Sequence, residues 1–168
     1  VMARAFSVAR NGRPGPVVVA LPEDVLSAMT GAEPCRAVHP TEPAADHAQI
    51  QQVVKMLAGA SKPLVLVGGG AWQRESCEGL RQFAESNSLP VVTAFRFNDL
   101  IDNHSPSFVG EAGVAMRPFV RAAIEESDVI LALGIRFGEM TTDAYTLFVA
   151  PHPRQKLIHV HPADSEHG

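Results

Sequence analysis

Several residue types are scarce in this chain of 168 residues, and each scarcity excludes a class of protein. The only two cysteines, Cys35 and Cys77, are too far apart in the sequence for a Cys-x-x-Cys metal or redox motif, and two alone do not make a disulfide scaffold. We expect both thiols to be reduced and inert, in a cytoplasmic protein. The longest apolar runs, Val17–Leu21 and Val129–Leu133, are too short to cross a membrane, and no export signal is visible.

Neither sign of charge dominates the chain. The chain carries 14 basic and 18 acidic residues, a net charge of −4, and lacks the basic block that nucleic acid would require. With 46% hydrophobic residues it is too apolar for a disordered segment and long enough to bury a core. We therefore expect a globular protein whose partners include neither nucleic acid nor a membrane.

The first part of the sequence has the pattern of an isolated helix and strand. Val1–Arg10 is typical of the tail of an amphipathic helix, and Val17–Leu21 of a short buried strand. A helix and a strand with no sheet to join cannot make a domain. We interpret residues 1–29 as the end of a domain whose main part lies elsewhere, and the proline-bearing residues 30–47 as a linker.

Residues 48–168 show a regular alternation of elements. Asp46 and Gln49 have the spacing of a helix-capping box, which marks the start of the first predicted helix. Further helices are predicted over Arg74–Glu85 and from Pro118, the latter with Phe119, Val120, Ala123 and Ile124 facing inward. The predicted strands are Leu64–Val67, Val91–Phe95, Ser107–Val109, Val129–Leu133 and Lys156–His161. Continuous apolar strands alternating with helices predict an α/β fold, doubly wound, with a mostly parallel sheet and helices on both faces.

Glycines follow the apolar strands at their carboxyl ends. In open parallel sheets ligands bind at this edge, and glycine lets the backbone approach a phosphate closely. The alternative is that these glycines only make tight strand-to-helix turns. The candidate cofactor-binding residues are Gly68, Gly69, Gly70, Gly134, Ile135, Arg136 and Phe137.

Two charged or titratable features near these strand ends have alternative explanations. Arg136 could meet a phosphate as a bidentate donor, or form a salt bridge with Glu139 or Asp143. His159 and His161 share one face of a strand, but no cysteine or suitably spaced carboxylate accompanies them. We therefore predict a solvated or hydrogen-bonding strand end and no metal site.

No self-contained active site is visible. The dinucleotide fingerprint is incomplete, because Gln73 stands where its third glycine would fall. A P-loop and a Gly-x-Ser-x-Gly elbow are both absent from the sequence. We assign no catalytic residue and no metal ligand in this chain.

The ordered series of motifs resembles a known enzyme family. It is similar to thiamine diphosphate-dependent enzymes of the acetolactate synthase and benzoylformate decarboxylase type, from the end of their first domain through their central, Rossmann-like domain. The matching stretches are Arg13–Val25, Pro63–Gly70, Leu89–Thr93, Gly110-x-x-Gly113 and Asp128–Phe137.

The resemblance implies a parent enzyme with three domains. In that family thiamine diphosphate lies between the first and third domains, usually across a dimer interface. A glutamate of the first domain activates the cofactor, and a Gly-Asp-Gly to Asn motif of the third holds Mg²⁺ and the diphosphate. This chain has neither, since Glu23 lies at the wrong end of the first domain and no Gly-Asp-Gly occurs. The resemblance therefore implies a 2-keto acid decarboxylase or carboligase, a homodimer or homotetramer, in which this chain alone is not catalytic.

The central domain of such enzymes binds FAD in some members, ADP in others and nothing in the rest. This sequence differs from many flavin-binding members at two places. His159-Val160-His161 stands where they have an acidic Asp-x-Asp, and Phe95–His104 replaces a Lys-Gly turn. Two alternatives to the enzyme remain open, a free-standing nucleotide- or flavin-binding α/β domain and a purely structural domain.

Overall fold

The computed structural model describes residues 1–39, 41, 43–70 and 72–167. It divides into two compact units. The first comprises Val1–Ala44 and Pro162–Ser165, and the second comprises Ala45–His161 and the residues from Glu166 onward. Pro40 and Glu42, within the predicted linker 30–47, lie outside the described residues.

The first unit contains two helices and a long extended segment. Helix α1 spans Met2–Arg10, as predicted, and the one-turn helix α2 spans Glu23–Leu26. The predicted buried strand Val17–Leu21 is wrong, because the segment is extended without a partner strand and the side chain of Val18 is 93% exposed. A strand needs a neighbour for its N–H and C=O groups, and the described residues of this unit offer none.

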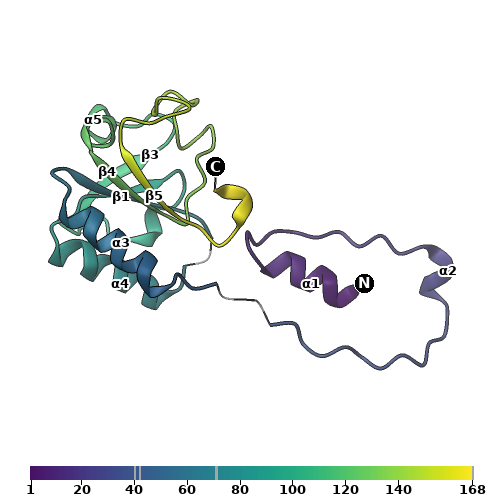
Figure 1. Cartoon of the computed structure of the whole chain (residues 1–168). Coiled ribbons are helices and arrows are strands. Elements are labelled where there is room, and N and C mark those ends of the chain that lie inside the picture. Colours follow the sequence, from purple (N-terminus) through teal and green to yellow (C-terminus); the bar gives the residue numbers. More distant parts are fainter. Residues whose placement is uncertain (40, 42, 71, 168) are drawn as a thin grey trace. The chain divides into compact units, whose positions relative to one another are not determined.

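The second unit is built on a five-stranded sheet (Figure 1). Its order is β3-β2-β1-β4-β5 and every neighbouring pair is parallel. The order corresponds to the first five positions of the dinucleotide-binding arrangement 3-2-1-4-5-6. The strands are β1 Pro63–Val67, β2 Val91–Ala94, β3 Phe108–Ala112, β4 Val129–Leu133 and β5 Lys156–Val160. The prediction of a doubly wound α/β fold is confirmed.

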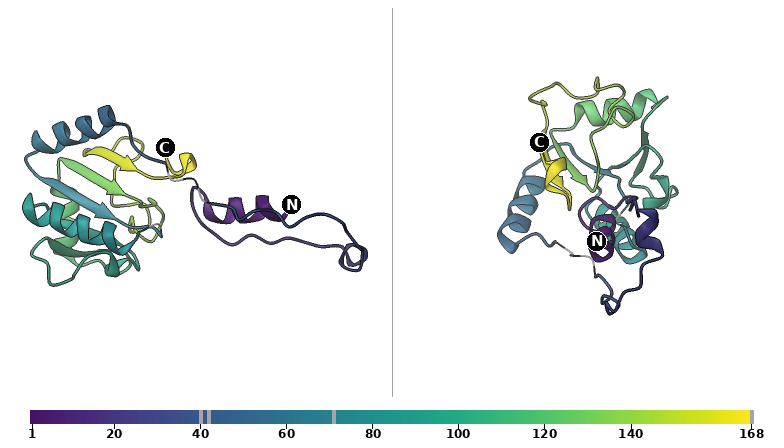
Figure 2. Two further views of the ribbon diagram at one scale, coloured as in Figure 1. Left: turned by 90° about the horizontal axis from the view of Figure 1, so that it is seen from below. Right: turned by 90° about the vertical axis from the view of Figure 1, so that its right-hand side faces the viewer.

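Helices cover both faces of the sheet (Figures 1 and 2). Helices α3, His47–Ala58, and α4, Arg74–Ser86, lie on one face, and α5, Pro118–Glu126, lies on the other. The predicted capping box is confirmed, because the Asp46 side chain accepts from the Gln49 N–H while the Gln49 side chain accepts from the Asp46 N–H. Two short 3₁₀ turns, η1 Asn98–Leu100 and η2 Asp164–Glu166, complete the described elements.

The core follows the two-residue period of the strands. Along β1, Leu64 and Leu66 point into the α5 side, whereas Val65 and Val67 point into the α3–α4 side. All four side chains are at most 1% exposed, so both layers are closed to solvent at this central strand. Strand β5 is the exception, being half-exposed along its length at the edge of the sheet.

Helix α5 and strand β3 differ in part from the prediction. Phe119, predicted to face inward from α5, is in its first turn and is 56% exposed, whereas Val120 and Ile124 are the buried residues of this helix. The third strand begins at Phe108 rather than Ser107 and continues to Ala112 through Gly110, whose φ of +149° accompanies a shift in register against β2. No helix in the described part of the chain is long and apolar enough to cross a membrane.

Candidate functional site

The seven predicted site residues come together at the carboxyl edge of β1 and β4. These strands are neighbours in register from Pro63 and Val129 to Val67 and Leu133, so the loops after them are adjacent. The Gly68 N–H donates to the Leu133 carbonyl at 3.1 Å, and the Gly134 N–H donates to the Val160 carbonyl at 2.8 Å. Both N–H groups therefore extend the ladder of the sheet and are already satisfied.

Three of the four glycines serve the close approach of these two loops. Gly69 and Gly134 have φ angles of +81° and +65°, which favour glycine. A Cβ on Gly69 would collide with the Gly134 carbonyl oxygen, and one on Gly134 would lie 2.7 Å from the Gly68 carbonyl oxygen. Gly68 is also tight, because its Cβ would lie 2.8 Å from the Cβ of Ala94. Gly70 alone faces open space, since a Cβ there would have no neighbouring heavy atom within 4 Å.

Trp72 lies over this meeting point, and no sequence motif pointed to it. Its indole Nε1 donates to the Gly68 carbonyl at 2.7 Å and would lie 3.4 Å from a Cβ on Gly134. The half-buried ring packs against the core cluster on the α3–α4 side. The signal that could have identified it is its position, as the chain's only tryptophan, two residues after a glycine run.

Arg136 extends from the loop after β4 into solvent. Its side chain is 61% exposed, and its Nε lies 3.5 Å from an Oε of Glu166. The predicted salt-bridge partners were wrong: Asp143 pairs instead with Arg121 at 2.6 Å. Glu166 lies thirty residues farther along the chain than this arginine, so local spacing gave no sign of the pair. The phosphate-binding role of Arg136 stays a prediction.

Ile135 and Phe137 are structural residues of the loop. The Ile135 side chain is fully buried, and its carbonyl accepts a hydrogen bond from His159 Nε2 at 2.9 Å. The Phe137 ring packs edge-on against Phe148 and His159, with ring centroids 5.5 and 5.3 Å apart. Burial lowers the pKa of His159 below its usual 6.5, so the neutral imidazole is the form that holds the loop.

The predicted hydrogen-bonding strand end is thereby confirmed for His159. The rings of His159, His161 and His167 form a cluster, with centroids 5.3 to 6.4 Å apart. Among the described residues no group of His, Cys, Asp and Glu has the arrangement needed to hold a metal ion. Both cysteines are free, Cys35 exposed and Cys77 half-buried, and burial raises the pKa of the Cys77 thiol.

A polar network at the ends of β2 and β3 likewise had no sequence signature. The buried Thr93 hydroxyl donates to Asn98 at 2.6 Å, and the Asn98 amide donates to Glu111 at 2.9 Å. The other carboxylate oxygen of Glu111 accepts from the Arg96 N–H at 2.8 Å, where φ is +69°. Glu111 thus fixes the turn that follows β2, in which Arg96 has its positive φ.

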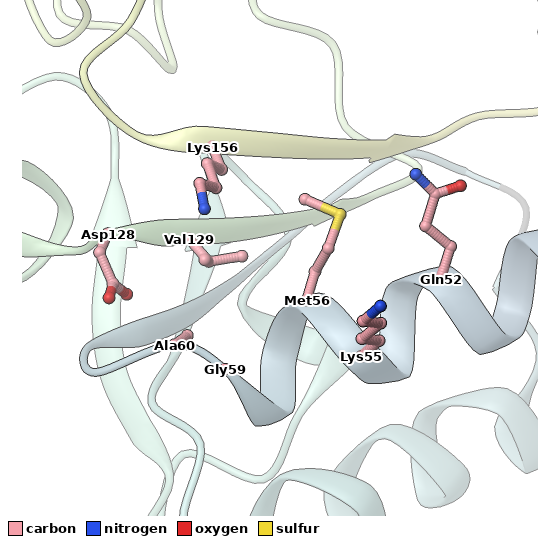
Figure 3. A pocket seen from close by; sticks show the side chains of 8 residues that line it. All are labelled: Gln52, Lys55, Met56, Gly59, Ala60, Asp128, Val129 and Lys156. Carbon is pink, nitrogen blue, oxygen red and sulfur yellow. The ribbon is translucent and has the colours of Figure 1, made fainter.

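Two pockets of the second unit lie away from the strand-end glycines. One, of about 390 Å³, is at the amino end of β4 and β5 (Figure 3). Its lining residues are Gln52, Lys55, Met56, Gly59, Ala60, Asp128, Val129 and Lys156. The other, of about 210 Å³, is lined by Phe137 and by residues of the loop between β4 and β5 such as Tyr145 and Phe148. Of the seven predicted residues, Phe137 alone lines either of these two pockets.

The site does not fit a flavin or adenine nucleotide in this arrangement. The Trp72 indole stands over Gly134, where a phosphate would need to approach the backbone. The sequence holds no Gly-Asp-Gly triplet, and Glu23 is exposed on α2.

The fold and the motif order agree with one known protein family. The central domain of thiamine pyrophosphate enzymes matches residues 50–168. The chain belongs to this family. The predicted resemblance is confirmed, and the predicted Rossmann-like central domain has its expected architecture.

Relatives of known name match almost the whole chain. The acetolactate synthase isozyme 2 large subunit of Escherichia coli (strain K12) is 32% identical over 98% of this chain and 30% of its own length. An acetolactate synthase of Mycobacterium bovis is 35% identical over 98% of this chain and 27% of its own length. The acetolactate synthase large subunit of Haemophilus influenzae is 34% identical over 94% of this chain and 28% of its own length. The chain thus spans less than a third of the length of these relatives.

Proposed function

We infer that this chain is the central part of a thiamine diphosphate-dependent enzyme that decarboxylates a 2-keto acid or joins it to a second carbonyl compound, like acetolactate synthase. The observation that carries the proposal is the continuous match to acetolactate synthases over 98% of the chain, including the stretch before the central domain. The seven motif residues do not carry it, since five of them take part in the packing of the two loops, namely Gly68, Gly69, Gly134, Ile135 and Phe137.

The proposal assigns the catalytic groups to other parts of the parent. Thiamine diphosphate and Mg²⁺ would be held by its first and third domains, in a homodimer or homotetramer of the cytoplasm. Residues 1–29 would end the pyrimidine-binding domain, 30–47 would link it, and 48–168 would form the central domain. The 93% exposure of Val18 and 52% exposure of Leu21 support this division, because such apolar side chains gain free energy by joining another surface.

One observation favours a mainly structural role for the central domain. The Trp72 indole, held on the Gly68 carbonyl, fills the crevice in which other folds of this type hold a nucleotide. Of the seven predicted cofactor-binding residues, Gly70, which faces open space, and Arg136, whose side chain is exposed, are the two that a nucleotide could still contact. FAD or ADP would bind here only if the Trp72 side chain left the crevice.

The test is to read the gene on both sides of this segment and to assay the complete product with thiamine diphosphate, Mg²⁺ and pyruvate. We expect an upstream glutamate and a downstream Gly-Asp-Gly motif, carbon dioxide release from pyruvate or a related 2-keto acid, and loss of turnover when that glutamate becomes glutamine. The 168-residue chain alone, assayed beside it, should give no turnover. A complete product without these motifs or without any 2-keto acid turnover would overturn the proposal.

A further inference from the structure

The Trp72 indole occupies a definite place at the carboxyl edge of the sheet. Its Nε1 is 2.7 Å from the Gly68 carbonyl oxygen, which follows β1, and it stands 3.4 Å from where a Cβ of Gly134, which follows β4, would be. One side chain therefore bridges the ends of the two central strands. A bare backbone at both strand ends, which glycine provides, is what allows an indole to lie so close.

The same place is where the sheet topology would bring a ligand. The chain connection from β1 runs through α4 to β2 on one side, whereas β4 lies on the other side of β1. The strand order therefore reverses between β1 and β4, and ligands of open α/β sheets bind in the crevice outside that reversal. The indole fills this crevice with a group from the chain itself.

Other features of the crevice suit an anionic ligand. Arg136 lies two residues after Gly134 in the loop that borders the crevice, its side chain is 61% exposed, and its ion pair with Glu166 is long at 3.5 Å. Gly70 leaves open space beside the loop. A diphosphate would find a cation and close backbone here, if the indole did not stand in its way.

We propose that the Trp72 indole occupies the nucleotide crevice and that this residue determines which ligand the crevice accepts. With the indole on Gly68 the domain excludes adenine nucleotides. With a smaller side chain at position 72 it admits the diphosphate of ADP. The inference rests on the proposed role of residues 48–168 as a central domain. Its test measures nucleotide binding and not 2-keto acid turnover, so the two proposals can fail separately.

The competing explanation is that Trp72 only packs. The ring does contact the core cluster that contains Val67 and Leu131. If packing were its whole role, replacing it would lower the stability of the fold and create no binding. Leu57, which contacts the same cluster from α3, provides the matched control for a loss of packing far from the crevice.

The experiment measures ADP binding to the 168-residue chain by isothermal titration calorimetry, for wild type, W72A and L57A. The indole of Trp72 is the chain's only one, so its fluorescence reports on the crevice in wild type. We expect no heat and an unchanged emission spectrum for wild type at about 1 mM ADP, and an affinity at least about tenfold tighter for W72A. L57A should behave as wild type, and adding R136Q to W72A should weaken the new binding about tenfold.

Two results would overturn the proposal. One is binding of ADP to wild type at these concentrations, with or without a shift in emission, because the indole would then not exclude it. The other is a folded W72A variant that binds no better than wild type. If circular dichroism shows W72A to be unfolded, W72L replaces it, since leucine keeps apolar contact but cannot donate to the Gly68 carbonyl, and the same expectation applies.

Discussion

His159 on the edge strand β5 donates a hydrogen bond from Nε2 to the main-chain carbonyl of Ile135, 2.9 Å away in the loop after β4. This bond ties the last strand to the loop that carries Arg136. An ionised aspartate at position 159 could accept hydrogen bonds but could not donate one to a carbonyl. The histidine in place of an acidic residue therefore gives this loop a different anchor from that expected of a flavin-binding relative.

The first prediction concerns the pH dependence of this anchor. Burial lowers the pKa of His159 below the value of 6.5 that it has when unfolded. The unfolded chain then binds the proton more readily, so the stability contributed by neutral His159 is complete above pH 6.5 and is lost as the pH falls through the folded pKa. In urea titrations between about pH 7 and pH 5, we expect His159→Gln, which keeps an N–H donor but does not titrate, to lose less stability than wild type.

The control for this effect is His104→Gln, at an exposed histidine in the loop before β3. It should follow the wild-type curve. His159→Ala should in addition cost about 1 kcal/mol at neutral pH, because the Ile135 carbonyl loses its donor. A His159→Gln curve parallel to that of wild type over the whole range would contradict the assignment.

The second prediction compares two neighbouring glycines. Gly69→Ala places a Cβ against the Gly134 carbonyl oxygen at a φ of +81°, so we expect it to destabilise the domain by about 3 kcal/mol or more. Gly70→Ala meets no atom within 4 Å and should stay within about 0.5 kcal/mol of wild type. Chemical denaturation of both variants measures the difference. Equal effects would mean that the two loops do not meet as described.

The sheet could be predicted from the sequence because its signals are local. Strands β1 and β4 are continuous apolar runs bounded by proline, aspartate or glycine, and each was placed to within one residue. The start of α3 followed from Asp46 and Gln49, whose side chains interact over three residues. In such cases the residues that decide the structure are next to each other in the chain.

From the sequence, the location of the site could be predicted but its contacts could not. The edge of the sheet at Gly68 and Gly134 follows from topology, but the hydrogen bond from Trp72 depends on the path of the loop between them. Arg136 was paired by prediction with residues close in sequence, whereas its partner is Glu166. The exposed segment Val17–Leu21 shows the same limit, because whether an apolar run becomes a strand depends on a partner elsewhere.

The third prediction concerns acid stability on the outer face of α4. Arg81 holds the carboxylate of Glu78 with two hydrogen bonds of 2.6 and 3.0 Å, and together with Gln82 lowers its pKa from 4.5 to about 2. The stability from this group is present above pH 4.5 and is lost as the pH falls toward 2. Glu78→Gln should flatten the acid limb of a stability curve in this window. Glu75→Gln, on an exposed position of the same helix, should not.

The last prediction concerns the exposed apolar segment of the first unit. Its amides in Val17–Leu21 have no ladder partner among the described residues, whereas those of Val129–Leu133 lie between β1 and β5. In the dilute 168-residue chain, hydrogen exchange should therefore be fast in the first segment and slow in the second, which opens only with global unfolding. If residues 1–29 complete the sheet of another domain, the same amides should become slow in the full-length protein, because a neighbouring strand then accepts and donates their hydrogen bonds. Slow exchange in the isolated chain at monomeric concentration would show instead that this segment finds a partner within the chain itself.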